Sequence, residues 1–286
     1  VYSSMTWADI NLDGSYEAII GTKNSTLEYL SNTLQHDPTL TNAYFGNLNT
    51  IWYSGMELSA AFGQLDKDAP LEMIVGYFNA TAVVGGNPAE DTFAGTVSRL
   101  DYWKFDFSPP AGYKRVRSLI DPNLNLALTK SVTLPKAALG DIDGDGDQDM
   151  VITNGKIYYV ENVGNETFPF FIMRPDYYAS INLENLGKVF SGPQLKDLDN
   201  DGDYDLVVGY RTASKVGATY YENTGDAENP VWVERKWLFS NRKWNFRESN
   251  FTDPCFLYLT GAHDLVEAWE ETFGTSLWMT ALNVDQ

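Results

Sequence analysis

The chain has 286 residues and a formal net charge of −19, with 43% hydrophobic and 14% aromatic residues. This acidity argues against binding to nucleic acid, which needs clustered Lys and Arg, and against binding to an anionic membrane surface, while the hydrophobic content is too high for disorder. No run of about 18 apolar residues is present, so we expect no direct membrane span.

Four segments of the chain align without gaps, and each joins an acidic loop to a short β-branched strand. In chain order they are residues 8–21, 63–76, 140–153 and 196–209. We number them repeats 1 to 4 and call their loops loop 1 to loop 4, with position 1 at Asp9, Gln64, Asp141 and Asp197. The starts are 55, 77 and 56 residues apart, and a blade of four short strands needs about 40–60 residues.

The strand signals after these loops read EAII, EMIV, DMVI and DLVV, and aromatic strands follow three of them. We therefore expect an all-β fold, a β-propeller with about four or five blades that forms a single repeat domain over residues 1–286. A partial loop at residue 283 leaves two alternatives open: the two ends complete one closed ring, or the blades belong to a longer array.

Insertions are expected at 81–115, where Gly and Pro turn signals gather, and at 230–275. Within the second insertion, Leu265, Trp269 and Phe273 recur at a spacing of four, which predicts a helix over 261–274. We expect at most one or two short helices in the chain.

Acids occupy alternate positions of the loops, which is the pattern of a calcium site. Calcium takes six to eight oxygen ligands, and a flexible acidic loop supplies them from alternating positions and one backbone carbonyl. Glycine at position 6 of loops 1, 3 and 4 permits the sharp turn. Position 7 is expected to offer its carbonyl. The candidate metal ligands are Asp9, Asn11, Asp13, Ser15 and Glu17; Asp141, Asp143, Asp145, Asp147 and Asp149; and Asp197, Asp199, Asp201, Asp203 and Asp205.

Loop 2 departs from this pattern. Gln64 replaces the first acid, and Ala69 followed by Pro70 replaces the glycine turn, so that only Asp66, Asp68 and Glu72 remain as candidate ligands. The sequence leaves metal binding by loop 2 open, and we expect about three or four structural calcium ions in total. An EF-hand is excluded, because position 12 is Ile or Val in every loop, the last acid is at position 9, and a strand begins directly after it.

The segments GDIDGDGDQDMVIT and KDLDNDGDYDLVVG resemble the FG-GAP and VCBS repeat families, which are known from integrin α-chain propellers and many secreted proteins. The resemblance implies calcium-binding propeller blades whose ions are structural and not catalytic. No Gly-Ala-Pro follows any loop, which argues against a ligand site of the integrin kind.

Four N-glycosylation sequons occur, at Asn24, Asn79, Asn165 and Asn250. With the calcium loops they favour a secreted or cell-surface glycoprotein that carries N-linked glycans. The first residues show no signal-peptide pattern, so we expect any such segment to have been removed. Trp232, Trp237 and Trp244 lie in a segment rich in Trp, Arg and Lys, where they either pack a strand onto the propeller or meet sugars or another subunit.

The leading functional hypothesis is a non-enzymatic extracellular scaffold or adhesion module, with a protein partner or self-assembly into a surface complex or filament. Only two histidines occur, far apart in sequence, which argues against a zinc site or a His-based catalytic triad. Two alternatives stay open: a carbohydrate-binding, lectin-like propeller, and a propeller-type polysaccharide lyase or dehydratase.

Overall fold

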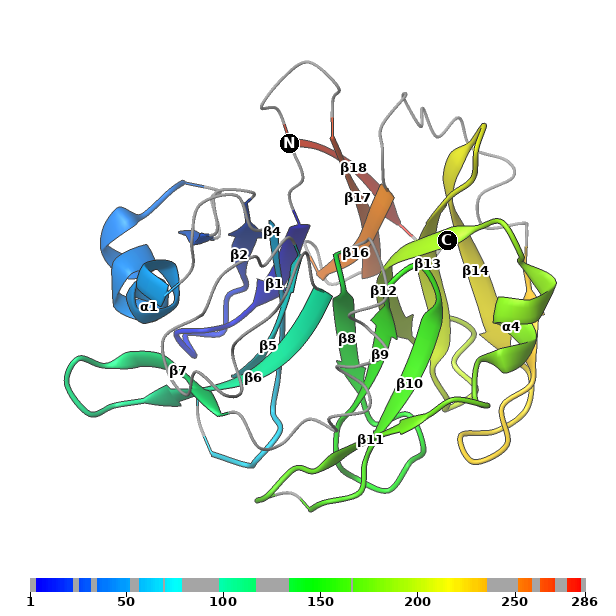
Figure 1. Ribbon diagram of the computed structural model, residues 1–286, viewed down its shortest axis with the longest axis horizontal. Coiled ribbons are helices and arrows are strands. Elements are labelled where there is room, and N and C mark those ends of the chain that lie inside the picture. The colour runs from blue at the N-terminus through cyan, green and yellow to red at the C-terminus, as the bar shows by residue number, and fades with distance from the viewer. Residues whose placement is uncertain are drawn as a thin grey trace. The chain divides into compact units, whose positions relative to one another are not determined.

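The computed structural model of the protein describes eleven stretches of the chain: 4–22, 26–31, 35–51, 57–68, 70–78, 98–116, 134–165, 167–235, 252–258, 263–270 and 277–283. Its secondary structure is dominated by antiparallel strands, arranged as five sheets, three with four strands and two with three. Within every sheet the strands follow chain order (Figure 1). The all-β, β-propeller prediction is confirmed. None of the helices in these stretches is long and apolar enough to cross a bilayer.

The first two sheets, blades 1 and 2, carry loops 1 and 2. Blade 1 contains β1 (Ser4–Ala8), β2 (Glu17–Gly21) and β3 (Leu27–Leu30). Blade 2 contains β4 (Glu57–Gly63), β5 (Glu72–Phe78), β6 (Ser98–Asp106) and β7 (Gly112–Val116). The predicted insertion at 81–115 therefore includes two regular strands of blade 2, β6 and most of β7.

The next two sheets, blades 3 and 4, carry loops 3 and 4. Blade 3 contains β8 (Lys136–Gly140), β9 (Asp149–Thr153), β10 (Ile157–Asn162) and β11 (Phe171–Arg174), drawn in green in Figure 1. Blade 4 contains β12 (Val189–Lys196), β13 (Asp205–Arg211), β14 (Val216–Asn223) and β15 (Trp232–Glu234). Each of the four acidic loops joins the first strand of its blade to the second.

The fifth sheet corrects the predicted helix at 261–274. It contains β16 (Thr252–Tyr258), β17 (His263–Glu270) and β18 (Leu277–Asn283), and β17 pairs with both neighbours. The helix prediction was wrong because residues four apart share one face of a strand as well as one face of a helix. Pairing on both sides then decides in favour of the strand.

The second strand of each blade is buried on both faces, which explains its unbroken apolar run. All five residues of β9 are buried, as are the first five of β13. Position 11 of the repeat, the middle of this run, is almost completely buried in all four blades: Ile19, Ile74, Val151 and Val207.

The chain divides into two compact units. One comprises Tyr2–Lys136 and Val163–Ile172, and the other comprises Val1, Ala137–Asn162 and Met173–Gln286. Each unit has its own apolar core, the first around blades 1 and 2 and the second around blades 3 and 4. The expectation of a single domain over the whole chain stays a prediction.

Two helices occur in the described stretches, and neither was placed by the sequence analysis. α1 (Pro38–Ile51) is capped at its N-terminus by Asp37. The Oδ1 atom of Asp37 accepts hydrogen bonds from the backbone N–H groups of Thr39 and Leu40 at 2.9 and 3.0 Å. Its Phe45 is fully buried and stacks on Tyr113. α4 (Ala179–Glu184) buries Ile181 in the core around blades 3 and 4.

A serine and a glycine face each other across the first and second strands of three blades. The pairs are Ser4 with Gly21, Ser59 with Gly76, and Ser191 with Gly209. In the first two pairs the serine hydroxyl donates to a backbone carbonyl further along the chain, at Leu58 (2.8 Å) and Pro135 (2.7 Å). The same two carbonyl oxygens lie only 2.0 Å from where a Cβ on Gly21 or Gly76 would be, so these positions need glycine.

Candidate metal centres

The acid at position 9 of each loop forms a hydrogen bond with the backbone at the beginning of the same loop. In every loop one of its carboxylate oxygens accepts the backbone N–H of position 2. The four hydrogen bonds are Ile10 to Glu17 (3.2 Å), Leu65 to Glu72 (2.7 Å), Ile142 to Asp149 (3.0 Å) and Leu198 to Asp205 (2.9 Å). The position 9 acid thus serves as an anchor in addition to its predicted role as a ligand.

A tyrosine of the third strand supports the anchor in blades 3 and 4. The Tyr159 hydroxyl donates to Asp149 at 3.0 Å, and the Tyr220 hydroxyl donates to Asp205 at 2.9 Å. The sequence analysis missed this role. The strand register shows which residue takes this role. The residue opposite position 11 is a tyrosine in all four blades: Tyr29, Tyr102, Tyr159 and Tyr220.

Backbone conformation in the loops confirms the glycine prediction and adds a second turn position. Gly14, Gly146 and Gly202, at position 6, have φ of 87°, 101° and 103°. Position 4 is also left-handed in every loop, although only loop 3 has glycine there: Leu12 (60°), Lys67 (62°), Gly144 (78°) and Asn200 (62°). Leucine rarely adopts this conformation, since its Cβ approaches the following carbonyl.

Replacing Leu12 with glycine is expected to stabilise the protein by about 1 kcal/mol, because glycine takes the left-handed conformation without the steric cost. The Leu12 side chain is 54% exposed, so little apolar burial is lost. Denaturant unfolding measures the change. Leu12→Ala is the control, since it shortens the same side chain but keeps a Cβ. A loss of stability in Leu12→Gly would contradict the left-handed backbone at this position.

Carboxylates converge in loops 3 and 4. Ligand oxygens of Asp141, Asp143 and Asp149 all lie within 4.8 Å of one another, and so do those of Asp197, Asp199 and Asp205. These are positions 1, 3 and 9, as the alternating pattern predicts. The Asp141 Oδ1 atom is buried and accepts no hydrogen bond, although an ionised oxygen in such a place needs a partner. A hard cation fits this donor set, which contains only oxygen.

In these loops the aspartate at position 5 makes hydrogen bonds within the turn, whereas the aspartate at position 7 has an oxygen without a partner. Asp145 and Asp201, at position 5, accept the backbone N–H of position 7 at 3.0 and 3.2 Å, which closes the turn. At position 7, the Oδ1 atoms of Asp147 and Asp203 are buried and unpartnered. Burial and the neighbouring position 5 aspartate raise the pKa of Asp147 and of Asp203 to about 6. A cation would therefore stabilise the ionised forms of these two side chains as well.

Burial also raises the pKa of the anchors, to about 7 for Asp149 and about 6 for Asp205. Hydrogen bonds from Ile142, Asn162 and Tyr159 to Asp149 act in the opposite direction but only partly offset the burial. A divalent ion among these groups would favour their ionised forms, because opposite charge lowers the pKa of a carboxyl.

Loop 1 has the same frame with fewer charges. Asp9 accepts the backbone N–H of Asp13 (3.0 Å) and of Gly14 (2.9 Å), as position 1 does in loops 3 and 4 toward position 6. Position 3 is Asn11, whose amide oxygen is a weaker ligand than a carboxylate. Its acids form no trio as close as those of loops 3 and 4 among the residues described.

Loop 2 brings its three acids together, but with a different partner. Asp66, Asp68 and Glu72 offer oxygens within 4.8 Å of one another. The Lys104 ammonium of β6 donates to Asp66 and, at 2.9 Å, to Asp68. The Gln64 amide donates to the Asp68 carbonyl. Burial, together with the charge of Asp66, raises the pKa of Glu72 to about 8.

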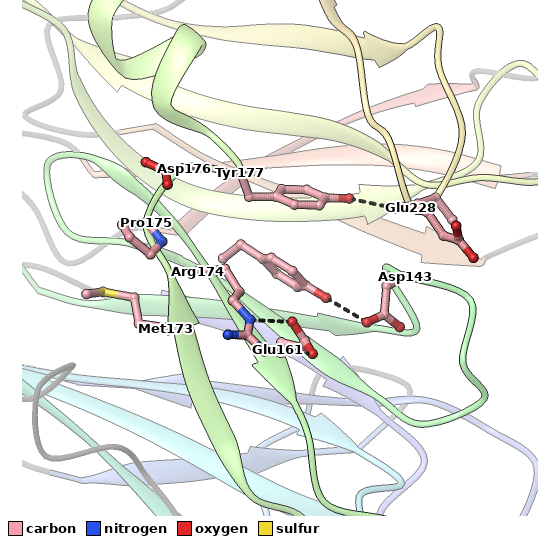
Figure 2. Close-up of a pocket in the computed structure, with 10 residues that line it drawn as sticks. Asp143, Glu161, Met173, Arg174, Pro175, Asp176, Tyr177 and Glu228 are labelled. Carbon is pink, nitrogen blue, oxygen red and sulfur yellow. Dashed lines mark hydrogen bonds and ion pairs between the residues drawn. The ribbon is translucent and has the colours of Figure 1, made fainter.

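A pocket of about 540 Å³ adjoins loop 3 in the unit that holds blades 3 and 4. Asp143, Glu161, Arg174 and Tyr177 are among the residues that line it. Figure 2 shows the Arg174 guanidinium beside Glu161 (2.5 and 3.1 Å) and Tyr177 reaching toward the segment of Glu228. Four acids and two tyrosines are among the ten residues that line the pocket, so a cationic or hydrogen-bonding group would find partners there.

The remaining predicted residues are only partly described. Trp232 lies in β15, and its half-buried ring packs 5.0 Å from the ring of Tyr178, which favours the packing interpretation. Asn165 is exposed in the turn between β10 and β11, where a glycan would be accessible. The other candidates lie outside the described residues: Trp237, Trp244, Asn24, Asn79 and Asn250.

The blades and their acidic loops define a β-propeller-type repeat protein with carboxylate clusters that could hold a cation. Residues 141–208 match the family model of the FG-GAP-like repeat. The match starts at position 1 of loop 3 and ends within β13, so it covers the two loops with the complete acidic pattern. It confirms the resemblance found in the sequence: the chain carries an FG-GAP-like repeat. A search of curated proteins gives no match.

Proposed function

We propose that the chain is a non-enzymatic, extracellular calcium-binding scaffold or adhesion glycoprotein whose ions hold together the first and second strands of blades 1, 3 and 4. The observation that carries the proposal is the set of buried, unpartnered carboxylate oxygens in loops 3 and 4, such as Asp141 Oδ1. Calcium suits them better than magnesium, because five acids in a flexible loop exceed what an octahedral, partly hydrated ion uses. Loop 1 provides a third site.

Calcium titration of the calcium-depleted chain is expected to give saturable heat and a higher melting temperature. At one hundred times the dissociation constant, each bound ion adds about 2.7 kcal/mol to the free energy of unfolding. Asp143→Asn and Asp199→Asn, the same position in loops 3 and 4, should each weaken the binding of one ion, because an amide oxygen is a weaker ligand than a carboxylate. Asp176→Asn, an exposed acid outside the loops, should leave calcium binding unchanged. No heat and no gain in melting temperature would overturn the proposal.

The pH dependence of that titration has a definite sign. The pKa of Asp149 is raised in the calcium-free fold, so its contribution to stability is present below the unfolded pKa and is lost as pH rises through about 7. Calcium binds the ionised form and restores the loss. The gain in melting temperature on adding calcium should therefore be larger at pH 7.5 than at pH 5.

The role as a scaffold is supported by the repeat architecture and by the FG-GAP-like match, since such repeats are typical of extracellular proteins. Analytical ultracentrifugation with calcium and with a chelator tests self-assembly into a surface complex or filament. A chain that stays monomeric in both conditions would argue against assembly with itself.

The carbohydrate-binding alternative has weaker support. Trp232, the one tryptophan candidate within the described part of the chain, packs against Tyr178 and does not present a flat platform. A polar pocket beside Asp143 is the place where a sugar would bind if this alternative holds.

A further inference from the structure

Blades 2, 3 and 4 each have a charged side chain at the same register position of the third strand, and the sign of this charge differs between the blades. In blade 2, position 10 of the repeat pairs with Trp103, so the next residue in the strand is Lys104. The same register places Glu161 in blade 3 and Glu222 in blade 4. Lys104 is therefore a charge reversal at an equivalent position of the repeat.

The glutamates of blades 3 and 4 form ion pairs with arginines. Glu161 binds Arg174, and Glu222 binds Arg235 through two hydrogen bonds of 2.8 and 2.6 Å. Both arginines thus hydrogen-bond to these glutamates and not to a loop carboxylate, so the acids of loops 3 and 4 are available to an external cation.

In blade 2 the lysine contacts the loop directly. The Lys104 ammonium binds Asp66, which is 4% exposed, and also Asp68. These carboxylates occupy positions 3 and 5. Position 3 is one of the three positions where the oxygens converge in loops 3 and 4. Position 1 is the neutral Gln64, whose amide is a donor toward the Asp68 carbonyl and not an anionic ligand.

We infer that Lys104 takes the place of the metal ion in blade 2, so that loop 2 is closed by an internal ammonium and binds no calcium. The inference rests on the proposed calcium binding of the other loops. It assigns a role to a residue that lies 38 positions from Asp66 in sequence. It also predicts that withdrawal of calcium leaves the stability of loop 2 unchanged.

The test compares Asp66→Asn with Asp143→Asn in the full chain, because both residues occupy position 3 of their loops. Asp66→Asn should lower the melting temperature by about 5–10 °C, equally in calcium and in chelator, and should leave the number of bound calcium ions unchanged. Asp143→Asn should weaken the binding of one calcium ion, and most of its loss in melting temperature should occur only when calcium is present.

Lys104→Met provides the second variant, because it keeps the apolar stem and removes the charge. It should lower the melting temperature in chelator, and combined with Asp66→Asn the losses should be less than additive. A lost calcium ion in Asp66→Asn, or an unchanged melting temperature in Lys104→Met, would overturn the inference. If the wild-type chain binds no calcium at all, the proposed function fails, while the non-additivity of the two variants in chelator still tests the ion pair.

Discussion

Asp149→Ala is expected to destabilise the protein by about 4 kcal/mol, even without calcium. The side chain is fully buried and accepts hydrogen bonds from the backbone N–H groups of Ile142 (3.0 Å) and Asn162 (2.7 Å) and from the Tyr159 hydroxyl (3.0 Å). Alanine leaves three buried donors without an acceptor, and each costs about 1–3 kcal/mol, although the costs are not additive. Denaturant unfolding in chelator measures this part of the effect.

A comparison with and without calcium separates the anchoring role of Asp149 from its proposed role as a ligand. In calcium, the loss should grow by the contribution of one bound ion. Asp145→Ala is the matched control, since Asp145 belongs to the same loop but is exposed and bonds only within the turn. Its cost in chelator should stay below about 1 kcal/mol. A similarly small cost for Asp149→Ala would show that the anchor hydrogen bonds contribute little.

The second large effect is expected from Gly76→Ala, at about 3 kcal/mol or more. The added Cβ would lie 2.0 Å from the carbonyl oxygen of Pro135, and relief requires movement of the backbone and not of a flexible side chain. The Ser59 hydroxyl donates to the same carbonyl, so the shift would also weaken that hydrogen bond. Thermal and denaturant unfolding measure the loss.

Gly46→Ala is the control for this glycine, because it lies in α1 of the same unit and its new Cβ would approach only the side chain of Asn42. Alanine in a helix is favoured over glycine by about 1 kcal/mol, so this variant should be neutral or more stable. If Gly76→Ala were as well tolerated, the close approach of the Pro135 carbonyl would be wrong.

The loops were predictable because their chemistry is local. Acids at alternate positions and a glycine at position 6 specify both the ligands and the turn within nine residues, and the structure brings positions 1, 3 and 9 together in loops 3 and 4. The second strands were equally accessible, since burial on both faces requires an unbroken apolar run. The left-handed backbone at position 4 was not predicted, because Leu12 and Lys67 are residue types that do not indicate this conformation.

The partners of the loops were not predictable from local patterns. Tyr159 and Lys104 reach their carboxylates from the third strand, and only the cross-strand register shows which residue faces the loop. The sequence analysis also missed helix α1, but this helix could have been predicted from a local pattern, because Asp37 followed by Pro38 is a recognisable helix start. Residues spaced by four over β17 were ambiguous from the beginning, and pairing with β16 and β18 decides between the two structures.

The hydrogen bond from position 2 to position 9 has a consequence for the kinetics and strength of ion capture. Protein contacts alone fix loops 3 and 4. They are this bond, the hydrogen bond from the backbone N–H of position 6 to the aspartate at position 1, and the hydrogen bond from the third-strand tyrosine to the aspartate at position 9. Under the proposed function, an arriving ion meets a preorganised site, so little affinity is lost to ordering the chain. Capture should accordingly be fast, with dehydration of the ion as its slow step.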